Sequence, residues 1–231
     1  MENGRRIVSE SVTGGRLSRR VYDEIKDRLS RGDFAGGQSL SVEQLRGDFG
    51  VSKQPVMEAL RLLAADGLVE IVPQVGSVVA KYSTAEAVDF FMMFARFEGA
   101  IAEVAAQRAT PTGLVRLRVF AAGMHTLESS DDEVVRAQSY RTGNRQFHGL
   151  IHEMANSAIM VATSRRLWDL SDFLITTAGP PNMMAPALGT RNDEHDAIVE
   201  AMERGNSEAA RVAMETHILE VIDLMQPVGT H

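Results

Sequence analysis

Apolar side chains recur with the period of an α-helix over most of the chain, and with the pattern of β-strands in one short stretch. Near the N-terminus, apolar residues four apart predict a helix over residues 17–31, and two shorter helices joined by a tight turn follow it. Residues 68–72 and 77–80 then alternate or run apolar as strands do, with Pro73 and Gly76 at the bend between them. This order of elements predicts a winged helix-turn-helix, a shape that lays one helix in a DNA groove.

The two shorter helices carry, at their ends, the residue types that begin and end helices. Ser41 with Gln44 has the spacing of a capping box, and Gly50 ends the same helix. Ser52 is placed to cap the next helix, which Gly67 closes in a left-handed conformation. These signals leave only a tight turn between the two helices.

After the expected wing, the pattern is helical throughout. Ser83 with Glu86 forms a second capping box, and further helices are expected to start at Thr110 and at Ser130. A loop over residues 179–187, rich in Pro and Met, interrupts the helices before the last two. The predicted fold class is mainly α, with the winged helix-turn-helix followed by an all-α bundle of six or seven helices.

The length and composition suit two domains, since the chain has 231 residues of which 44% are hydrophobic. We expect a flexible N-terminal arm over residues 1–16, the winged domain over 17–82, and an all-helical domain over 83–228. The absence of cysteine excludes disulfides and thiolate metal sites. No apolar run has the length of a membrane span, and the polar N-terminus is unlike a secretory signal, so we expect a cytoplasmic protein without a membrane partner.

The charge is distributed unevenly along the chain. Residues 1–83 carry 12 Lys and Arg against 11 Asp and Glu, whereas residues 84–231 carry 12 against 20, and the whole chain has a net charge of −7. The acidity therefore belongs to the second domain. A nearly neutral winged domain favours a specific, dimeric DNA binder over a general nucleic-acid coat, because non-specific affinity comes mainly from neutralised phosphates.

Two parts of the chain resemble known bacterial regulators. The DNA-binding domain of the GntR family is closely similar to the segment GVSKQPVMEALRLLAADGLVEIVPQVGSVVA. The FCD effector domain of the FadR-type branch resembles three later segments, RFEGAIAEVAAQRA, NRQFHGLIHEMANSAIM and EHDAIVEAMERGNSEAARVAMETHI. The resemblance implies a homodimer that binds a short palindromic operator, most often as a repressor, and releases it when a small metabolite enters the helical domain.

The expected DNA contacts lie at the start of the third helix and in the wing. Side chains at the start of a recognition helix reach base edges and phosphates, and a wing glycine lets the backbone approach the sugar-phosphate chain. The residues singled out are Ser52, Lys53, Gln54, Arg61 and Gly76.

Three positions depart from the pattern of the family. Met57 stands where an arginine is usual, and Glu43 and Val75 stand where a basic residue is common. An arginine can bind guanine or phosphate through two hydrogen bonds, and methionine can do neither. We therefore expect fewer charged contacts with DNA in each subunit and an unusual operator.

Histidines on three separate helices are candidates for a metal site. Asn144 and His148 are four residues apart and share one helical face, while His195 and His217 each lie along an apolar stripe. The resemblance implies a divalent metal held by one aspartate and three histidines, and Asn144 stands at the aspartate position. Zinc is the first choice, with nickel or another transition ion as alternatives. An amide in place of a carboxylate should weaken metal binding and strengthen the attraction for an anion.

A basic residue in the helical domain is a candidate for effector binding. The resemblance places Arg96 near the ligand pocket, where it could bind a small carboxylate metabolite through two hydrogen bonds. Alternatively, Arg96 is a surface residue paired with Glu98 or Glu103. His152 follows His148 by one turn and is expected at the pocket edge.

Two other functions remain open at the level of the sequence. The first is the same regulator with a metal-free pocket, in which the histidines bind the effector directly. The second is a metal-dependent hydrolase, since three histidines with an open coordination position resemble a hydrolytic zinc site. No general base is placed for it, because Glu153 and Glu194 follow or precede a histidine directly, and neighbours on a helix point about 100° apart. We therefore do not expect an enzyme.

Overall fold

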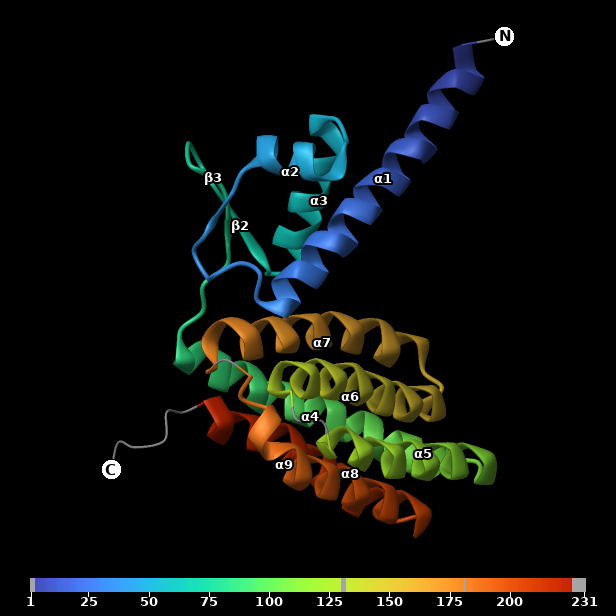
Figure 1. Ribbon diagram of the computed structural model, residues 1–231. Coiled ribbons are helices and arrows are strands. Elements are labelled where there is room, and N and C mark those ends of the chain that lie inside the picture. Colours follow the sequence, from blue (N-terminus) through green and yellow to red (C-terminus); the bar gives the residue numbers. More distant parts are fainter. Residues whose placement is uncertain (1–2, 130–131, 181, 226–231) are drawn as a thin grey trace. The chain divides into compact units, whose positions relative to one another are not determined.

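The chain divides into two compact units in the computed structural model, which describes residues 3–129, 132–180 and 182–225 (Figure 1). The first unit comprises residues up to Tyr82 together with Asp172–Thr177. The second comprises Ser83–Ser171 and the residues from Ala178 onward. Each unit has its own buried core.

The first unit is built on three helices: α1 (Asn3–Arg31), α2 (Val42–Phe49) and α3 (Lys53–Ala65). Helix α1 packs on α3, and of the apolar residues four apart that predicted it, Val21, Ile25 and Leu29 are fully buried while Leu17 is half-buried. The helix begins at Asn3, well before residue 17, where the sequence pattern placed its start. Once the packed part of a helix has formed, each added residue contributes a hydrogen bond without a new nucleation cost.

The turn between α2 and α3 follows the capping signals with one exception. The Ser41 hydroxyl accepts a hydrogen bond from the Gln44 N–H at 3.3 Å, and Gly50 ends α2 with φ of 62°. Ser52 is the N-cap of α3, but its exposed side chain makes no capping hydrogen bond. Gly67 follows α3 with φ of 80°, as a left-handed residue does.

A three-stranded antiparallel sheet completes the first unit. Its strands are β1 (Ser39–Leu40), β2 (Val69–Val72) and β3 (Gly76–Val79), in the order β1-β3-β2. Strand β1 was not predicted, because two residues are too few to show an alternating pattern. Gln74 lies in the wing turn between β2 and β3 with φ of 64°, and Gly76, the first residue of β3, has φ of 110°.

The second unit is a bundle of long helices with two short 3-10 segments. Its helices in the described residues are α4 (Thr84–Arg108), α5 (Pro111–Met124), α6 (Glu133–Ala155), α7 (Ala158–Ala178), α8 (Leu188–Glu203) and α9 (Ser207–Met225). The 3-10 segments are His125–Ser129 and Ala185–Ala187. The mainly helical fold class with a winged helix-turn-helix is thus confirmed.

Capping residues set where these helices begin. Ser83 and Glu86 form both halves of the capping box of α4, and the Thr110 hydroxyl accepts from the Gly113 N–H at the start of α5. Helix α6 is capped by Asp132 rather than by Ser130, which lies outside the described residues.

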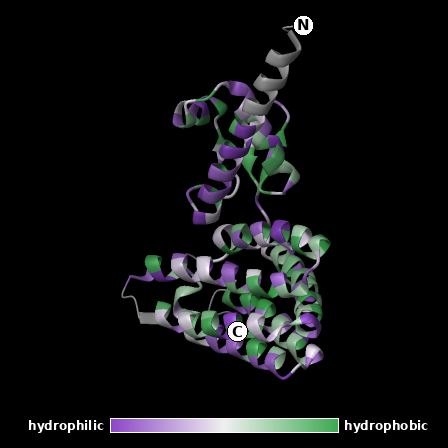
Figure 2. Cartoon of the chain, turned by 90° about the vertical axis from the view of Figure 1, so that its right-hand side faces the viewer, coloured by the Kyte–Doolittle hydropathy of each residue, from purple (hydrophilic) through white to green (hydrophobic). Residues whose placement is uncertain are grey.

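Helix α4 lies at the centre of the bundle and packs most closely against α9. Figure 2 shows hydrophobic and hydrophilic residues along the same helices, as expected of amphipathic helices that share a core. At Gly99 the two backbones approach each other, because a Cβ there would lie 2.7 Å from Cγ of Glu215 and 3.2 Å from the carbonyl oxygen of Arg211. This contact sets the distance between the helices that carry Glu98 and His217.

Candidate metal centre and nucleic-acid interface

Three buried imidazoles from three helices meet inside the second unit. His148 lies on α6, His195 on α8 and His217 on α9, and none is more than 1% exposed. Each offers one ring nitrogen within 4.8 Å of the others, and the Nε2 atoms of His148 and His217 are 3.3 Å apart. The cluster could therefore hold a metal ion, since imidazole nitrogen is a ligand for several divalent metals.

Asn144 also reaches this cluster from α6. Its Oδ1 lies 2.9 Å from Nε2 of His195 and accepts a hydrogen bond from the Tyr140 hydroxyl at 3.3 Å. The structure thus brings together the four residues that the sequence singled out as ligands. The amide supplies an oxygen without a negative charge.

Two carboxylates stand behind the histidines. Glu194 Oε2 lies 2.8 Å from Nδ1 of His217, and Glu98 Oε2 lies 3.7 Å from Nδ1 of His148. A carboxylate beside Nδ1 favours the tautomer with its proton on that nitrogen, which leaves the Nε2 lone pair facing the cluster. The Nε2 atoms of His148 and His217 then face each other 3.3 Å apart, and a bound cation could accept both lone pairs. The donor set therefore fits a metal.

The electrostatic environment keeps the imidazoles neutral. Burial lowers the pKa of His148, which Glu98 partly opposes, and burial lowers the pKa of His195 and His217 well below the usual value. Burial raises the pKa of Glu98, but contacts with His148 and His152 outweigh it and bring the value down to about 2. Neutral imidazoles beside an ionised carboxylate are in the protonation state that metal binding requires.

Arg191 is a buried cation beside the histidines that the sequence reasoning missed. Its side chain is nearly inaccessible, and Nη1 donates to Glu194 Oε2 and to the carbonyl oxygen of His217, both at 2.6 Å. Nη2 lies 3.0 Å from Nε2 of His217, and Nε is buried without a hydrogen-bond partner among the described residues. The signal was present in the sequence, because Arg191 precedes His195 by four residues and so shares its helical face.

Arg96 does not lie in this cluster. Its side chain is 76% exposed and pairs with Glu215 at 3.5 Å, not with Glu98 or Glu103. Two residues along a helix turn the side chain by about 200°, so the burial of Glu98 directs Arg96 outward. The structure therefore places Arg96 at the surface of the bundle and not inward at the cluster.

His152 lies one turn beyond His148 and is mostly buried. Its Nε2 is 2.8 Å from Glu98 Oε2, and Ser164 Oγ donates to Glu98 Oε1 at 2.5 Å. On its other side His152 lines a cavity of about 350 Å³ between α6 and α7, together with residues that include Arg145, Arg165 and Trp168. The residue therefore lies between the buried carboxylate and an opening at the surface of the bundle.

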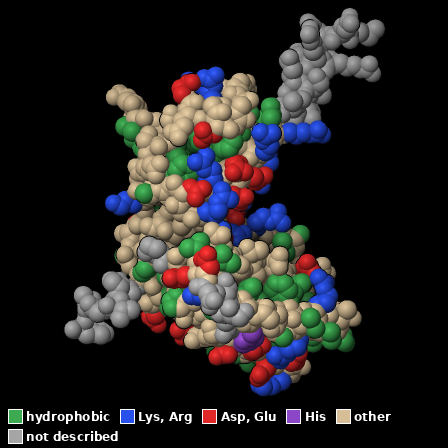
Figure 3. Space-filling model, viewed as in Figure 1, with side chains coloured by type: hydrophobic (Ala, Val, Ile, Leu, Met, Phe, Trp, Pro, Cys, Tyr) green, Lys and Arg blue, Asp and Glu red, His purple; other side chains and the backbone are tan. Residues whose placement is uncertain are grey.

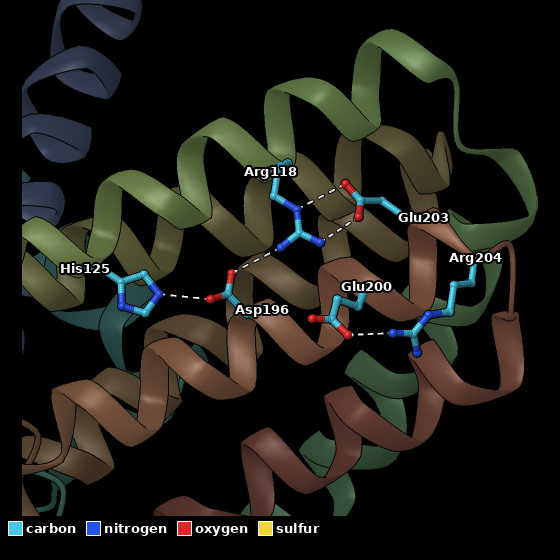
Figure 4. A network of polar contacts seen from close by, with 6 residues as sticks. All are labelled: Arg118, His125, Asp196, Glu200, Glu203 and Arg204. Carbon is cyan, nitrogen blue, oxygen red and sulfur yellow. Dashed lines mark hydrogen bonds and ion pairs between the residues drawn. The ribbon is translucent and has the colours of Figure 1, made fainter.

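A polar network holds α8 against α5 (Figure 4). Arg118 on α5 binds Glu203 through two hydrogen bonds, the shorter of 2.6 Å, and its Nη1 lies 3.4 Å from Asp196 Oδ1. His125 Nε2 lies 3.0 Å from Asp196 Oδ2. Because Asp196 is adjacent to His195 in α8, this network helps to fix the helix that carries the third imidazole.

The residues expected to contact DNA are exposed in the first unit. Ser52, Lys53 and Gln54 lie at the start of α3, and Arg61 lies two turns further with its side chain 65% exposed and Glu58 at 3.6 Å. Gly76 begins β3 at the wing. The polar side chains of α3 thus lie at the surface, while the apolar stripe of the same helix is buried.

The three departures from the family pattern differ in exposure. Val75 is 65% exposed in the wing turn, Met57 is half-buried, and Glu43 forms an ion pair with Arg46 at 2.5 Å. In Figure 3 the visible face of the first unit mixes Lys and Arg with Asp and Glu.

A winged helix-turn-helix followed by a helical bundle is the architecture of a DNA-binding regulator, and the buried histidine cluster in the bundle could hold a metal ion. Residues 17–79 match the model of the GntR family of bacterial regulatory proteins, and residues 89–220 match that of the FCD domain. The chain belongs to the GntR family, in the FadR-type branch that carries an FCD domain. The family consists of transcription regulators and not of enzymes, as the sequence analysis expected.

Known proteins are similar over nearly the whole chain. An uncharacterised HTH-type transcriptional regulator of Streptomyces ambofaciens is 26% identical over 95% of this chain and 89% of its own length. The HTH-type transcriptional repressor GlaR of Escherichia coli is 24% identical over 89% and 94%. The solved structure of Escherichia coli McbR/YncC has a TM-score of 0.71 at 19% identity and covers 90% of this chain and 96% of that chain, which shows a shared fold.

None of the helices in the described residues is long and apolar enough to cross a membrane.

Proposed function

We propose that this regulator is a homodimeric repressor of metabolic genes whose binding to a palindromic operator depends on a small carboxylate metabolite. Support for repression comes from the similarity to relatives named as repressors, GlaR among them. A single winged helix reads only a short half-site, and two-fold symmetry doubles the sequence that is read. Ser52, Lys53, Gln54, Arg61 and Gly76 would make the contacts to DNA.

The ligand site we propose is a divalent metal site formed by His148, His195, His217 and the amide of Asn144. The observation that carries it is the pair of Nε2 atoms of His148 and His217, which face each other at 3.3 Å while their Nδ1 atoms face carboxylates. Zinc is the preferred ion, with nickel or another transition ion as alternatives. Bound there, the metal would supply a positive charge that attracts an anionic ligand.

Arg191, rather than Arg96, is the cation that would bind the carboxylate of the effector. A guanidinium presents several N–H donors in a geometry that matches a carboxylate, and the Nε of Arg191 is buried without a partner among the described residues. His152, the other candidate for effector binding, contacts Glu98 and lines the cavity between α6 and α7. The effector must bind the operator-competent and operator-incompetent states with different affinities, because otherwise it could not shift their populations.

A metal-free form of the same site is the second candidate. The observation that favours it is the contact between Arg191 Nη2 and Nε2 of His217 at 3.0 Å, which places a guanidinium at the lone pair that a metal would use. In that form the histidines and Arg191 bind the effector directly.

A thermal-shift screen tests the proposed regulation. Small organic acids are screened against the metal-stripped wild-type protein, with and without zinc, and against a His148→Ala, His195→Ala double variant. The metal proposal predicts a carboxylate that stabilises the wild type only with zinc, and the metal-free form predicts one that stabilises it without zinc. Operator DNA, selected from a pool of duplexes, should be released on addition of the same acid. If no acid stabilises the protein or affects the operator complex, the proposed regulation is wrong.

A further inference from the structure

Glu98 is a fully buried carboxylate at the centre of the bundle. It lies on α4 with 0% exposure, and its contacts with polar groups come from α6 and α7. Ser164 Oγ donates to Oε1 at 2.5 Å, while Oε2 lies 2.8 Å from His152 Nε2 and 3.7 Å from His148 Nδ1. Burying a charged carboxylate costs several kcal/mol unless nearby groups compensate for it.

The four candidate ligands carry no negative charge of their own. His148, His195 and His217 are neutral imidazoles, and Asn144 is an amide. A divalent ion held by them alone would keep its full charge in a buried place, where a charge without a counter-charge is unfavourable. Glu98 and Glu194 are the two carboxylates that face the far nitrogens of these rings, one at His148 and one at His217.

The two carboxylates differ in their other partners. Glu194 is already paired with Arg191, whereas Glu98 is bound by a hydroxyl and imidazoles. Nδ1 of His148 is buried without a hydrogen-bond partner among the described residues, and Glu98 Oε2 is the carboxylate oxygen beside it. A carboxylate behind a ligating histidine fixes the tautomer and the direction of the ring, and it raises the basicity of the ligating nitrogen.

We infer that Glu98 is a positioning residue of the metal site: its charge beside Nδ1 of His148 favours the proton on that nitrogen, directs the Nε2 lone pair into the cluster, and supplies near this ring the negative charge that Asn144 does not. The inference rests on the metal site proposed above. Ser164 holds Oε1 of Glu98, and His152 contacts the same Oε2 that lies beside His148.

The position of the proton on His148 can be read without any metal. In metal-free protein labelled with ¹⁵N-histidine, long-range ¹H–¹⁵N correlation spectra should show the proton of His148 on Nδ1. In a Glu98→Gln variant the spectra should show a shift toward the Nε2 form, because an amide no longer selects for a donor. A merely structural role for Glu98 would leave the tautomer unchanged. A wild-type proton on Nε2 would overturn the inference even if the variant did not fold.

Zinc affinity, measured by competition with a chelator, gives the second readout. Glu98→Gln should weaken zinc binding by about 10- to 100-fold, and Glu103→Gln, which removes a carboxylate from the same helix outside the cluster, should leave it unchanged. Equal affinities in the folded Glu98→Gln variant and the wild type would overturn the inference. If the wild type itself binds no zinc, the metal proposal fails, and the tautomer measurement then decides separately whether Glu98 orients His148.

Discussion

Arg191 donates its Nη2–H toward the Nε2 of His217 across 3.0 Å, so a guanidinium lies against one of the nitrogens that would bind a metal. The same side chain is anchored by Glu194 and by the carbonyl oxygen of His217. Arg191 therefore affects the binding of cations and of anions at the histidine cluster in opposite directions. Its charge disfavours a second cation, and it favours an anion.

We expect Arg191→Gln to strengthen zinc binding and to weaken the binding of carboxylates. Removing a buried positive charge a few ångströms from the metal should improve zinc affinity by about tenfold, which corresponds to about 1.4 kcal/mol. Competition with a chelator measures the first effect, and thermal shifts with organic acids measure the second. Arg204→Gln, which changes an exposed arginine just after α8, is the matched control. Weaker zinc binding in Arg191→Gln would show that the guanidinium supports the metal site instead.

The stability of the metal-free protein should fall as the pH is lowered from about 7 to about 5. Burial lowers the pKa of His148, His195 and His217, so below their ordinary value of 6.5 the unfolded state binds more protons than the folded state. Stability therefore rises with pH in this window, by at most about 1.4 kcal/mol per pH unit for each histidine. Glu194 acts in the opposite direction, because its pKa is raised to about 7 in the fold, but one carboxyl does not outweigh three imidazoles.

Urea unfolding at pH 7 and pH 5 in the presence of a chelator measures this dependence. A His195→Gln variant should show a smaller loss between the two values, since it removes one of the three groups. Glu98 does not contribute in this window, because its pKa of about 2 and its ordinary value of 4.5 both lie below it. Stability that is constant or increases toward pH 5 would contradict the neutral state of the cluster.

Salt should weaken operator binding less steeply than in arginine-rich relatives. Each phosphate neutralised by the protein adds about 0.9 to the slope of log affinity against log salt concentration. Met57, Glu43 and Val75 contribute no positive charge, and Glu43 already neutralises Arg46 by an ion pair. Filter binding of a selected operator over a range of salt concentrations measures the slope. Met57→Arg should steepen it if the side chain reaches a phosphate, and a wild-type slope as steep as that of such relatives would contradict the expectation.

Gly99→Ala should destabilise the bundle and disturb the cluster through the contact between α4 and α9. The new methyl group would lie 2.7 Å from Cγ of Glu215 and 3.2 Å from a backbone oxygen, so α9 must move away. Overpacking of this kind costs about 1–3 kcal/mol, which exceeds the gain of about 1 kcal/mol from replacing glycine in a helix. Gly123→Ala on α5, where no atom lies within 4 Å of the added Cβ, is the control and should be neutral or stabilising in thermal unfolding.

More of the fold than of the site could be predicted from the sequence. Helical periodicity, the Ser83–Glu86 capping box and the Gly67 closure are local signals, and the structure agrees with them. Strand β1 was missed because its two residues are recruited by pairing with β3, which is a long-range effect.

In the site, helical spacing is a local pattern and indicated that His148, His195 and His217 can point inward, while the family resemblance suggested them as metal ligands. Arg191 and Glu98 were missed as site residues, since charged residues on helices usually face solvent and only tertiary packing shows that these two are buried. The placement of Arg96 came from the family resemblance alone, and the direction of its side chain on α4 does not follow from that resemblance.

The most direct test of the account is the zinc content of the protein. Protein purified with added zinc and dialysed should contain one zinc ion per chain by elemental analysis, and the His148→Ala, His195→Ala double variant should contain almost none. Circular dichroism should confirm that the double variant is folded. Equal amounts of zinc in the two proteins, whether near zero or near one, would contradict the claim that the histidine cluster is a metal site.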